Sequence, residues 1–422
     1  MLKKSVLITL VVLMLFAGAV SAQETEITLL NSKGEIQAQL EDAAKAFSDA
    51  NEDIEMEIIP APAGQSPYEM AVSLYASGNA PTMSMLDPGD MGAFKEKFLN
   101  LSDQKWVEHS RKGALDAATF DGKVYAFALA IEGHSLIYNK KVVDKAVGGN
   151  FDPDSIRTRE DLEQLFVNIK ENTDAAPLVI SPMDWSLGGH FIERIYSLQA
   201  KEMDEVIDFL DKLRAGKVNL AENDKFMGLM KTFDVMKKYN IDKNDPLSGT
   251  YDRGPELLGS GEVGIWYMGN WAWPQISEFN TSNAEYGFIP VPVSNNPKEY
   301  GNSEIIKGSS KFIGIDKAQS TEAEQEAAKK FLNWLLESET GQKLYVNEMK
   351  IIPPYTNVDL KPKDPLAKSI ISYMDAGNTI EAIPVMPGDH WSHVGASMQK
   401  YLADYIEKAG LAEEIENYWE NK

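Results

Sequence analysis

The sequence contains no cysteine and only five histidines among its 422 residues. Without thiols the chain can form no disulfide framework, Cys-ligated zinc site, iron–sulfur cluster or thiol nucleophile. Basic residues are also few, with 41 Lys and Arg against 64 Asp and Glu, which gives a formal charge of -23. A chain this acidic repels nucleic acid and anionic lipid, so neither is an expected partner.

The motifs that usually mark a catalytic or metal site are missing as well. The sequence has no GxxxxGK[ST], no HExxH and no GxSxG. His390 and His393 are three positions apart, but a zinc site needs further ligands, so no metal and no cofactor is expected. Residues 259–264 match GxGxxG, yet they precede a strand-like segment instead of following one, which indicates a turn.

The first 22 residues have the pattern of an export signal. Lys3 and Lys4 precede an apolar run over 6–20, and residues 20–22 are small enough for a signal peptidase to cut after them. The run is shorter than the roughly 20 residues that a membrane-spanning helix needs. Because no cysteine follows it for lipid attachment, we expect a soluble protein of a periplasm-like space without a lipid anchor.

Beyond the signal, short apolar strands alternate with amphipathic helices. The pattern predicts strands over 26–31, 54–60 and 82–86, and helices over 37–51 and 67–77. This alternation is typical of right-handed crossovers and a mostly parallel sheet. The ligand crevice of such a sheet lies beyond the carboxyl ends of its strands, and Asn31, Lys33 and Asp87 fall on loops at that edge.

A second, helix-rich block follows the first, and no Pro/Gly/Ser-rich linker separates the two. Large units without a tether indicate lobes joined by several crossing strands, and therefore a hinge. The fold class that we expect is α/β, with two lobes.

Tryptophan stands beside polar residues in several expected loops. The pairs are Asp184-Trp185, Asn270-Trp271 and His390-Trp391. A sugar ring has apolar C–H faces that stack on aromatic rings, and hydroxyl groups that bond carboxylates, amides and ammonium groups. Tryptophans in such surroundings suit a carbohydrate cleft, although any single tryptophan is more often buried in a core.

Two other functions use the same residue types. Paired carboxylates such as Glu132 and Asp184 could flank a glycosidic bond at about 5–10 Å, as in a secreted glycoside hydrolase. Aromatic rings and carboxylates could also enclose a polyamine or another cationic ligand through cation–π contacts. Lys33 near the cleft counts against the cationic ligand, and turnover of oligosaccharides would distinguish the hydrolase.

Three segments of the sequence resemble segments of a known protein family. Residues 130–140 read AIEGHSLIYNK, residues 269–273 read GNWAW, and residues 383–386 read IPVM shortly before Trp391. With these segments the chain resembles the extracellular solute-binding proteins of carbohydrate ABC importers, the maltodextrin-binding type most closely. The resemblance implies that Glu132 bonds sugar hydroxyls and that Trp271 and Trp391 stack on sugar.

The resemblance also implies a periplasmic binding protein fold, with a mostly parallel sheet flanked by helices in each lobe. We expect an N-terminal lobe of 23–131 plus about 310–352 and a C-terminal lobe of about 135–305 plus 356–422. The hinge is expected near 131–134, 304–311 and 352–356. A monomer would bind a neutral mono- or oligosaccharide in the cleft and deliver it to the membrane permease of the importer.

Residues 85–90 depart from the family pattern, because they lack an aromatic residue and an arginine. Because of this departure, we still expect a ligand of the sugar class, but we do not expect maltodextrin itself. Carboxylates at Asp87, Glu132 and Asp184 would repel a uronic acid and favour a neutral sugar. The expected ligand-binding residues are Asn31, Lys33, Asp87, Glu132, Asp184, Trp185, Asn270, Trp271, His390 and Trp391.

Overall fold

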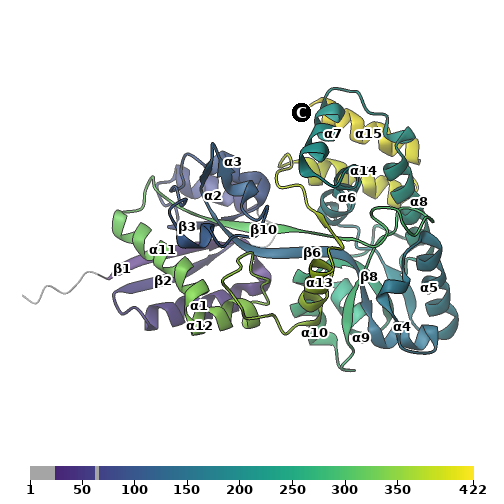
Figure 1. Ribbon diagram of the computed structural model, residues 1–422, viewed down its shortest axis with the longest axis horizontal. Helices are drawn as coiled ribbons and strands as arrows, with labels where there is room; N and C mark the ends of the chain where they lie inside the picture. Colours follow the sequence, from purple (N-terminus) through teal and green to yellow (C-terminus); the bar gives the residue numbers. More distant parts are fainter. Residues whose placement is uncertain (1–23, 62–65) are drawn as a thin grey trace, which may run out of the picture.

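The computed structural model describes residues 24–61 and 66–422, so the predicted export signal over 1–22 lies outside the described residues. The described chain forms two lobes connected by two long strands, β6 (Phe127–Asn139) and β10 (Ile305–Ile315), as Figure 1 shows. The predicted α/β fold with two lobes is confirmed.

The main sheet runs through both lobes in the order β2-β1-β3-β10-β6-β8-β7, with β11 beside β10 and β9 beside β6. Its other strands are β1 (Thr25–Asn31), β2 (Ile54–Pro60), β3 (Met83–Leu86), β7 (Ala176–Val179), β8 (Val263–Gly269), β9 (Tyr286–Ile289) and β11 (Thr379–Glu381). β1 pairs in parallel with β2 and β3, as the sequence predicts. β6 and β10 pair antiparallel, and they pass between the lobes side by side.

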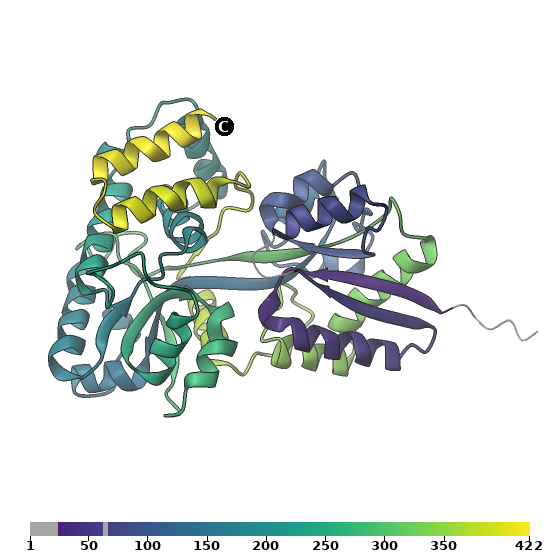
Figure 2. The same cartoon turned by 180° about the vertical axis from the view of Figure 1, so that it is seen from behind.

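The first lobe is built around an apolar core of residues from 27–130 and 312–358. Its helices are α1 (Gln37–Asp49), α2 (Pro67–Ala76), α3 (Met91–Phe94), α11 (Glu322–Glu337) and α12 (Glu339–Gln342). α11 begins with a capping box, in which the hydroxyl of Thr321 accepts from the N–H of Glu324 and the carboxylate of Glu324 accepts from the N–H of Thr321. Seen from behind in Figure 2, α1 and the α11 region cover one face of the β1-β2 sheet.

The second lobe holds the remaining apolar clusters, which draw on residues from 131–306 and 352–419. Its helices are α4 (Lys140–Val147), α5 (Arg159–Asn172), α6 (Ile192–Ser197), α7 (Met203–Arg214), α8 (Asp224–Tyr239), α9 (Arg253–Ser260), α10 (Trp273–Phe279), α13 (Pro365–Asp375), α14 (His390–Leu402) and α15 (Lys408–Glu420). The lobes are thus interleaved in sequence, because each is made of two separate stretches of chain.

The last passage of the chain between the lobes lies later than the expected 352–356. Ile352 pairs with Ile131 at the lobe boundary, but Tyr355 turns back into the first lobe. Its ring is fully buried there, 5.7 Å from Trp106 and 4.9 Å from Phe127 between ring centroids. Burial of this aromatic ring keeps the chain in the first lobe through Val358, and Leu360 still packs against the core of that lobe.

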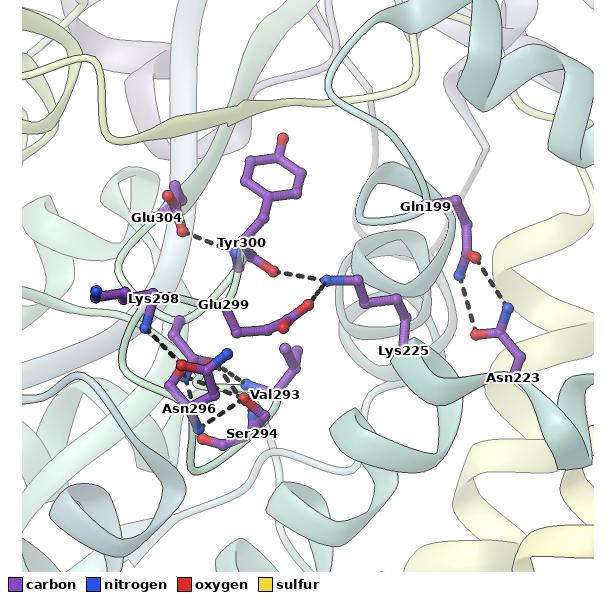
Figure 3. Close-up of polar contacts among 12 residues, drawn as sticks. Gln199, Asn223, Lys225, Val293, Ser294, Asn296, Lys298, Glu299, Tyr300 and Glu304 are labelled. Carbon is purple, nitrogen blue, oxygen red and sulfur yellow. Dashed lines mark hydrogen bonds and ion pairs between the residues drawn. The ribbon is translucent and has the colours of Figure 1, made fainter.

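The loop that leads into β10 is fixed to the second lobe by polar contacts (Figure 3). Lys225 of α8 pairs with the carboxylate of Glu299 and donates to the carbonyl oxygen of Tyr300 at 2.9 Å. The amide oxygen of buried Asn302 accepts from the N–H of Val293 at 2.8 Å. β10 therefore leaves the second lobe from a fixed point.

Candidate functional site

The carboxyl end of β1 brings a lysine to the boundary between the lobes. Asn31, the last residue of β1, is buried and uses its side chain to shape the following loop. Its amide oxygen accepts from the N–H of Lys33 at 2.8 Å, and its amide nitrogen donates to the carbonyl of Lys33 at 3.0 Å and to Gln37 at 2.7 Å. Because these bonds occupy the amide, the structure places Asn31 behind Lys33 and not among the expected ligand contacts.

Lys33 is the centre of an ion cluster. Its ammonium nitrogen lies 2.5 Å from Glu132 on β6 and 2.7 Å from Glu35, and its side chain is only 4% exposed. Burial alone would lower the pKa of Lys33, but attraction to Glu132 and Glu35 outweighs burial and raises that pKa. Burial likewise raises the pKa of Glu35, yet the charge of Lys33 lowers it overall. Lys33 and Glu35 are therefore held in their charged forms.

A pocket between the lobes joins this cluster to the second lobe. Lys33, Glu35 and Glu132 line it together with Asn270 and Trp271. The structure thus brings together four of the expected site residues: Lys33, Glu132, Asn270 and Trp271. Charged groups of the first lobe and an aromatic ring of the second lobe face the same space.

Asn270 keeps β6 and the loop after β8 in contact. It is 7% exposed, and its amide oxygen accepts from the backbone N–H of Gly133 at 2.9 Å. Gly133 immediately follows Glu132, so this bond fixes the backbone that carries the carboxylate. We interpret Asn270 as a positioning residue at the edge of the pocket.

The ring of Trp271 folds back over Gly269. A Cβ atom on Gly269 would lie 2.0–2.4 Å from three carbon atoms of that ring, far inside van der Waals contact. Gly269 has a φ of -108°, which any residue can adopt, so glycine is needed here for space and not for conformation. The missing side chain therefore sets the orientation of the Trp271 ring.

Trp271 belongs to a band of aromatic rings on the second lobe. His190 lies 4.9 Å from Trp271 and 5.5 Å from Trp185 between ring centroids, and Tyr251 lies 5.7 Å from Trp185. His134 of β6 stacks on His190 at 4.7 Å from the buried side. Burial lowers the pKa of His190 to about 4, against the opposing charge of Asp87, so this imidazole is neutral at pH 7.

A π-helical segment, Trp185–Phe191, supplies two rings of this band. Segments of this kind are rare and occur often at functional sites. Asp184 precedes the segment, and its carboxylate accepts from the N–H of Trp185 at 2.8 Å. Its backbone abuts α14, because a Cβ on Gly395 would lie 2.4 Å from the Asp184 carbonyl oxygen. Asp184 therefore anchors Trp185, while Trp185 itself reaches the band.

Asp87 lies at the carboxyl end of β3 and pairs with the crossing strand. Its carboxylate oxygen is 2.5 Å from the ammonium nitrogen of Lys311 on β10. Asp90 lies on the same loop, and burial, followed by the charge of Asp87, raises the pKa of Asp90 to about 6. The first lobe thus presents a second polar group, distinct from that around Lys33.

The two residues expected from the late segment are separated by the structure. The side chain of His390 is only 2% exposed and lies in the interior of the second lobe. Its Nε2 is 3.0 Å from the hydroxyl oxygen of Tyr196. Burial lowers its pKa to about 3. His390 is thus a core residue, and its prediction as a ligand contact is corrected. Trp391, by contrast, is 44% exposed and lies beside Gly189, next to His190.

His190, Tyr251, Glu35 and Lys311 are the site residues that the sequence analysis missed. Glu35 could have been found, because it lies two residues after Lys33 on the same loop. His190 had no such signal, since its segment reads as an ordinary loop before a helix. Within 24–61 and 66–422, no cluster of His, Asp and Glu could hold a metal ion. No helix in the same ranges is long and apolar enough to cross a membrane.

Comparison with known proteins identifies the family. The model of the bacterial extracellular solute-binding protein family matches residues 42–370, which is more than half of the chain. The chain belongs to this family, as the resemblance predicts. A comparison of the sequence with curated proteins finds no match.

Solved structures agree in fold. One of these structures is RafE in complex with raffinose, a protein also solved from Streptococcus pneumoniae. The sequence of the complex is 17% identical to this chain and its TM-score is 0.74. The match covers 94% of this chain and 99% of RafE. A sugar transporter protein from Bacillus licheniformis with stachyose is 18% identical with a TM-score of 0.70, over 94% and 100%. A mannobiose complex from Bifidobacterium animalis is 17% identical with a TM-score of 0.65, over 94% of both.

Proposed function

We propose that this protein binds a neutral sugar between its lobes and delivers it to the permease of an ABC importer. The observation that carries the proposal is the pocket in which Trp271 faces the cluster of Lys33, Glu35 and Glu132. A sugar ring could stack on the tryptophan while its hydroxyls bond the charged groups opposite. The solved relatives named above, with raffinose, stachyose and mannobiose, support this ligand class.

Transport would follow from closure of the lobes. A ligand that touches both lobes binds the closed form better and so shifts the protein toward it. β6, β10 and the passage after Val358 would act as the hinge, and the closed form would be what the permease recognises. We propose a monomeric, periplasmic protein without a lipid anchor that carries out no catalytic step.

The rival functions fit the site less well. Glu132 lines the pocket between the lobes but Asp184 does not, so these two acids do not flank one ligand as a hydrolase pair would. A cationic ligand would meet Lys33 and Lys311 beside the carboxylates that they neutralise. A neutral ligand avoids this repulsion.

Thermal unfolding with a panel of ligands tests the proposal. The panel contains raffinose, stachyose and mannobiose, with spermidine as the cationic rival. A sugar at about 100 times its dissociation constant should stabilise the folded protein by roughly 2.7 kcal/mol. Stabilisation by spermidine alone, or release of monosaccharide during incubation, would overturn the proposal.

A further inference from the structure

Helix α14 carries three residues on one face that contact the π-helical segment Trp185–Phe191 or the loop before it. They are Trp391, Gly395 and Gln399, and their spacing of four residues places them in a row along the helix. The side-chain amide of Gln399 donates to the carbonyl oxygen of Pro182 at 2.7 Å. The row therefore holds the π-helical segment and the loop that leads into it along about two turns of α14.

Two glycines make the closest approach in this row. A Cβ atom on Gly188 would lie 2.3 Å from the backbone nitrogen of Gly395 and 2.4 Å from the carbonyl oxygen of Trp391. A Cβ atom on Gly395 would lie 2.4 Å from the carbonyl oxygen of Asp184. Neither glycine has a positive φ, so both positions need glycine for space and not for conformation. The two backbones are in direct contact, and a single methyl group would push them apart.

The π-helical turn sets the direction of the side chains that precede α6. The N–H of Ile192 bonds to the carbonyl oxygen of Leu187, five residues earlier, where an α-helix would use the residue four positions earlier. One extra residue in the turn rotates the preceding side chains by about 100° around the axis relative to those of α6. Ile195 of α6 is buried in the core, whereas Trp185 and His190 lie in the aromatic band.

His190 connects the π-helical segment to the pocket between the lobes. Its ring centroid lies 4.9 Å from that of Trp271, which lines the pocket, and 4.7 Å from that of the buried His134. The ring of Trp271 therefore has two close neighbours, the backbone at Gly269 and the imidazole of His190. Because α14 fixes the segment that carries His190, a shift at α14 would reach the ring of Trp271.

We propose that the Gly188–Gly395 contact is a positioning element of the sugar site, in which α14 holds His190 at the distance that orients the Trp271 ring. Gly395 and Gln399 are positioning residues, because neither lines the pocket. This inference rests on the proposed function and adds to it a support that lies outside the pocket. The affinity for sugar then depends on how closely two backbones pack in the second lobe.

Titration calorimetry with raffinose, stachyose and mannobiose tests the proposal. G395A places a methyl group where the backbones meet, and we expect it to weaken binding of the best of these sugars by about tenfold. G410A is the control, because Gly410 also lies in a helix and a Cβ atom there would make only an ordinary contact, 3.6 Å from Ile406. Q399M removes the hydrogen bond to Pro182, with an expected loss of about threefold. It replaces G395A if that variant does not fold.

A double-mutant cycle with W271A separates positioning from a general loss of stability. If G395A acts through the ring of Trp271, it should weaken binding in the wild-type background and add nothing in the W271A background. Equal losses in both backgrounds, or no loss in either, would overturn the proposal.

Fluorine NMR of the protein labelled with fluorotryptophan keeps the positioning role separate from the proposed function. The resonance of Trp271 is assigned by its absence from W271A. Without any sugar present, this resonance should shift in G395A and stay in place in G410A. A wild type that binds none of the three sugars overturns the proposed function, whereas a Trp271 resonance that does not move in G395A overturns the positioning role.

Discussion

The ammonium nitrogen of Lys33 lies 2.5 Å from a carboxylate oxygen of Glu132, although the two residues are 99 positions apart in the sequence. One residue lies on the loop after β1, and the other on a strand that runs between the lobes. The contact fixes an edge of the first lobe against the hinge. Glu35 shares the same ammonium group at 2.7 Å, so one cation holds two carboxylates.

K33M should therefore destabilise the protein and weaken sugar binding. Removing one partner of a buried ion pair costs roughly 3–5 kcal/mol, and partial exposure of Glu35 and Glu132 should reduce the loss to about 1–3 kcal/mol. Chemical denaturation measures the change in the free energy of unfolding. K45M is the control. Lys45 pairs with Asp49 on the exposed surface, so K45M should change the free energy of unfolding little. Equal stability of both variants would contradict the role of the cluster.

W271A should weaken sugar binding by roughly 1–3 kcal/mol, because the variant loses ring stacking and buried apolar area. Titration calorimetry with the best ligand of the panel measures the loss. W273A is the matched control, since Trp273 packs on Tyr286 at 5.4 Å and is not among the residues that line the pocket. An unchanged affinity in W271A would remove the stacking proposal.

G269A should weaken binding without removing any group from the site. The added Cβ would push the Trp271 ring from its present position, so we expect roughly a tenfold loss of affinity, or about 1.4 kcal/mol. The chain contains eight tryptophans, so the fluorescence change on adding sugar is compared with that of W271A to isolate the contribution of this ring. G149A is the control, because nothing lies within 4 Å of a Cβ at that position. If G269A binds as the wild type does, the orientation of the ring does not depend on Gly269.

Glu193 should make stability depend on pH. Its side chain is buried and accepts from the N–H of Ile383 at 2.6 Å. Burial raises the pKa of Glu193 from 4.5 to about 7. Between those two pH values the folded state holds a proton that the unfolded chain releases, so stability falls as the pH rises through this window.

E193Q removes this titration and keeps an oxygen that can accept from Ile383. The variant should match the wild type near pH 4 and exceed it by about 1–3 kcal/mol at pH 8, where the wild type buries a charge without a cation. Denaturation of both proteins at the two pH values provides the test, because all other titrations cancel in the difference. A difference that does not change with pH would refute the assignment.

The sequence could predict those site residues whose position depends on the strand or motif next to them in the chain. The strand and loop pattern places Lys33 and Asp87 at the edge of a parallel sheet, and the motif around Glu132 locates the crossing strand. The orientation of a helix face could not be read in the same way. His390 and Trp391 are neighbours at the start of α14, yet helical geometry turns one into the core and the other outward. Likewise, Asn31 is a plausible ligand contact until its three hydrogen bonds are seen.

β10 lies between β3 and β6 in the sheet, but the whole segment from Lys140 to Glu304 separates it from β6 along the chain. The first lobe cannot complete its sheet or its core until residues 312–358 have been synthesised. Bringing β10 beside β6 closes a long loop, and the chain loses conformational entropy before the stabilising contacts form. Folds with many such long-range contacts form slowly. The second core likewise draws on residues up to Trp419, so neither lobe can complete its core before most of the chain has been made.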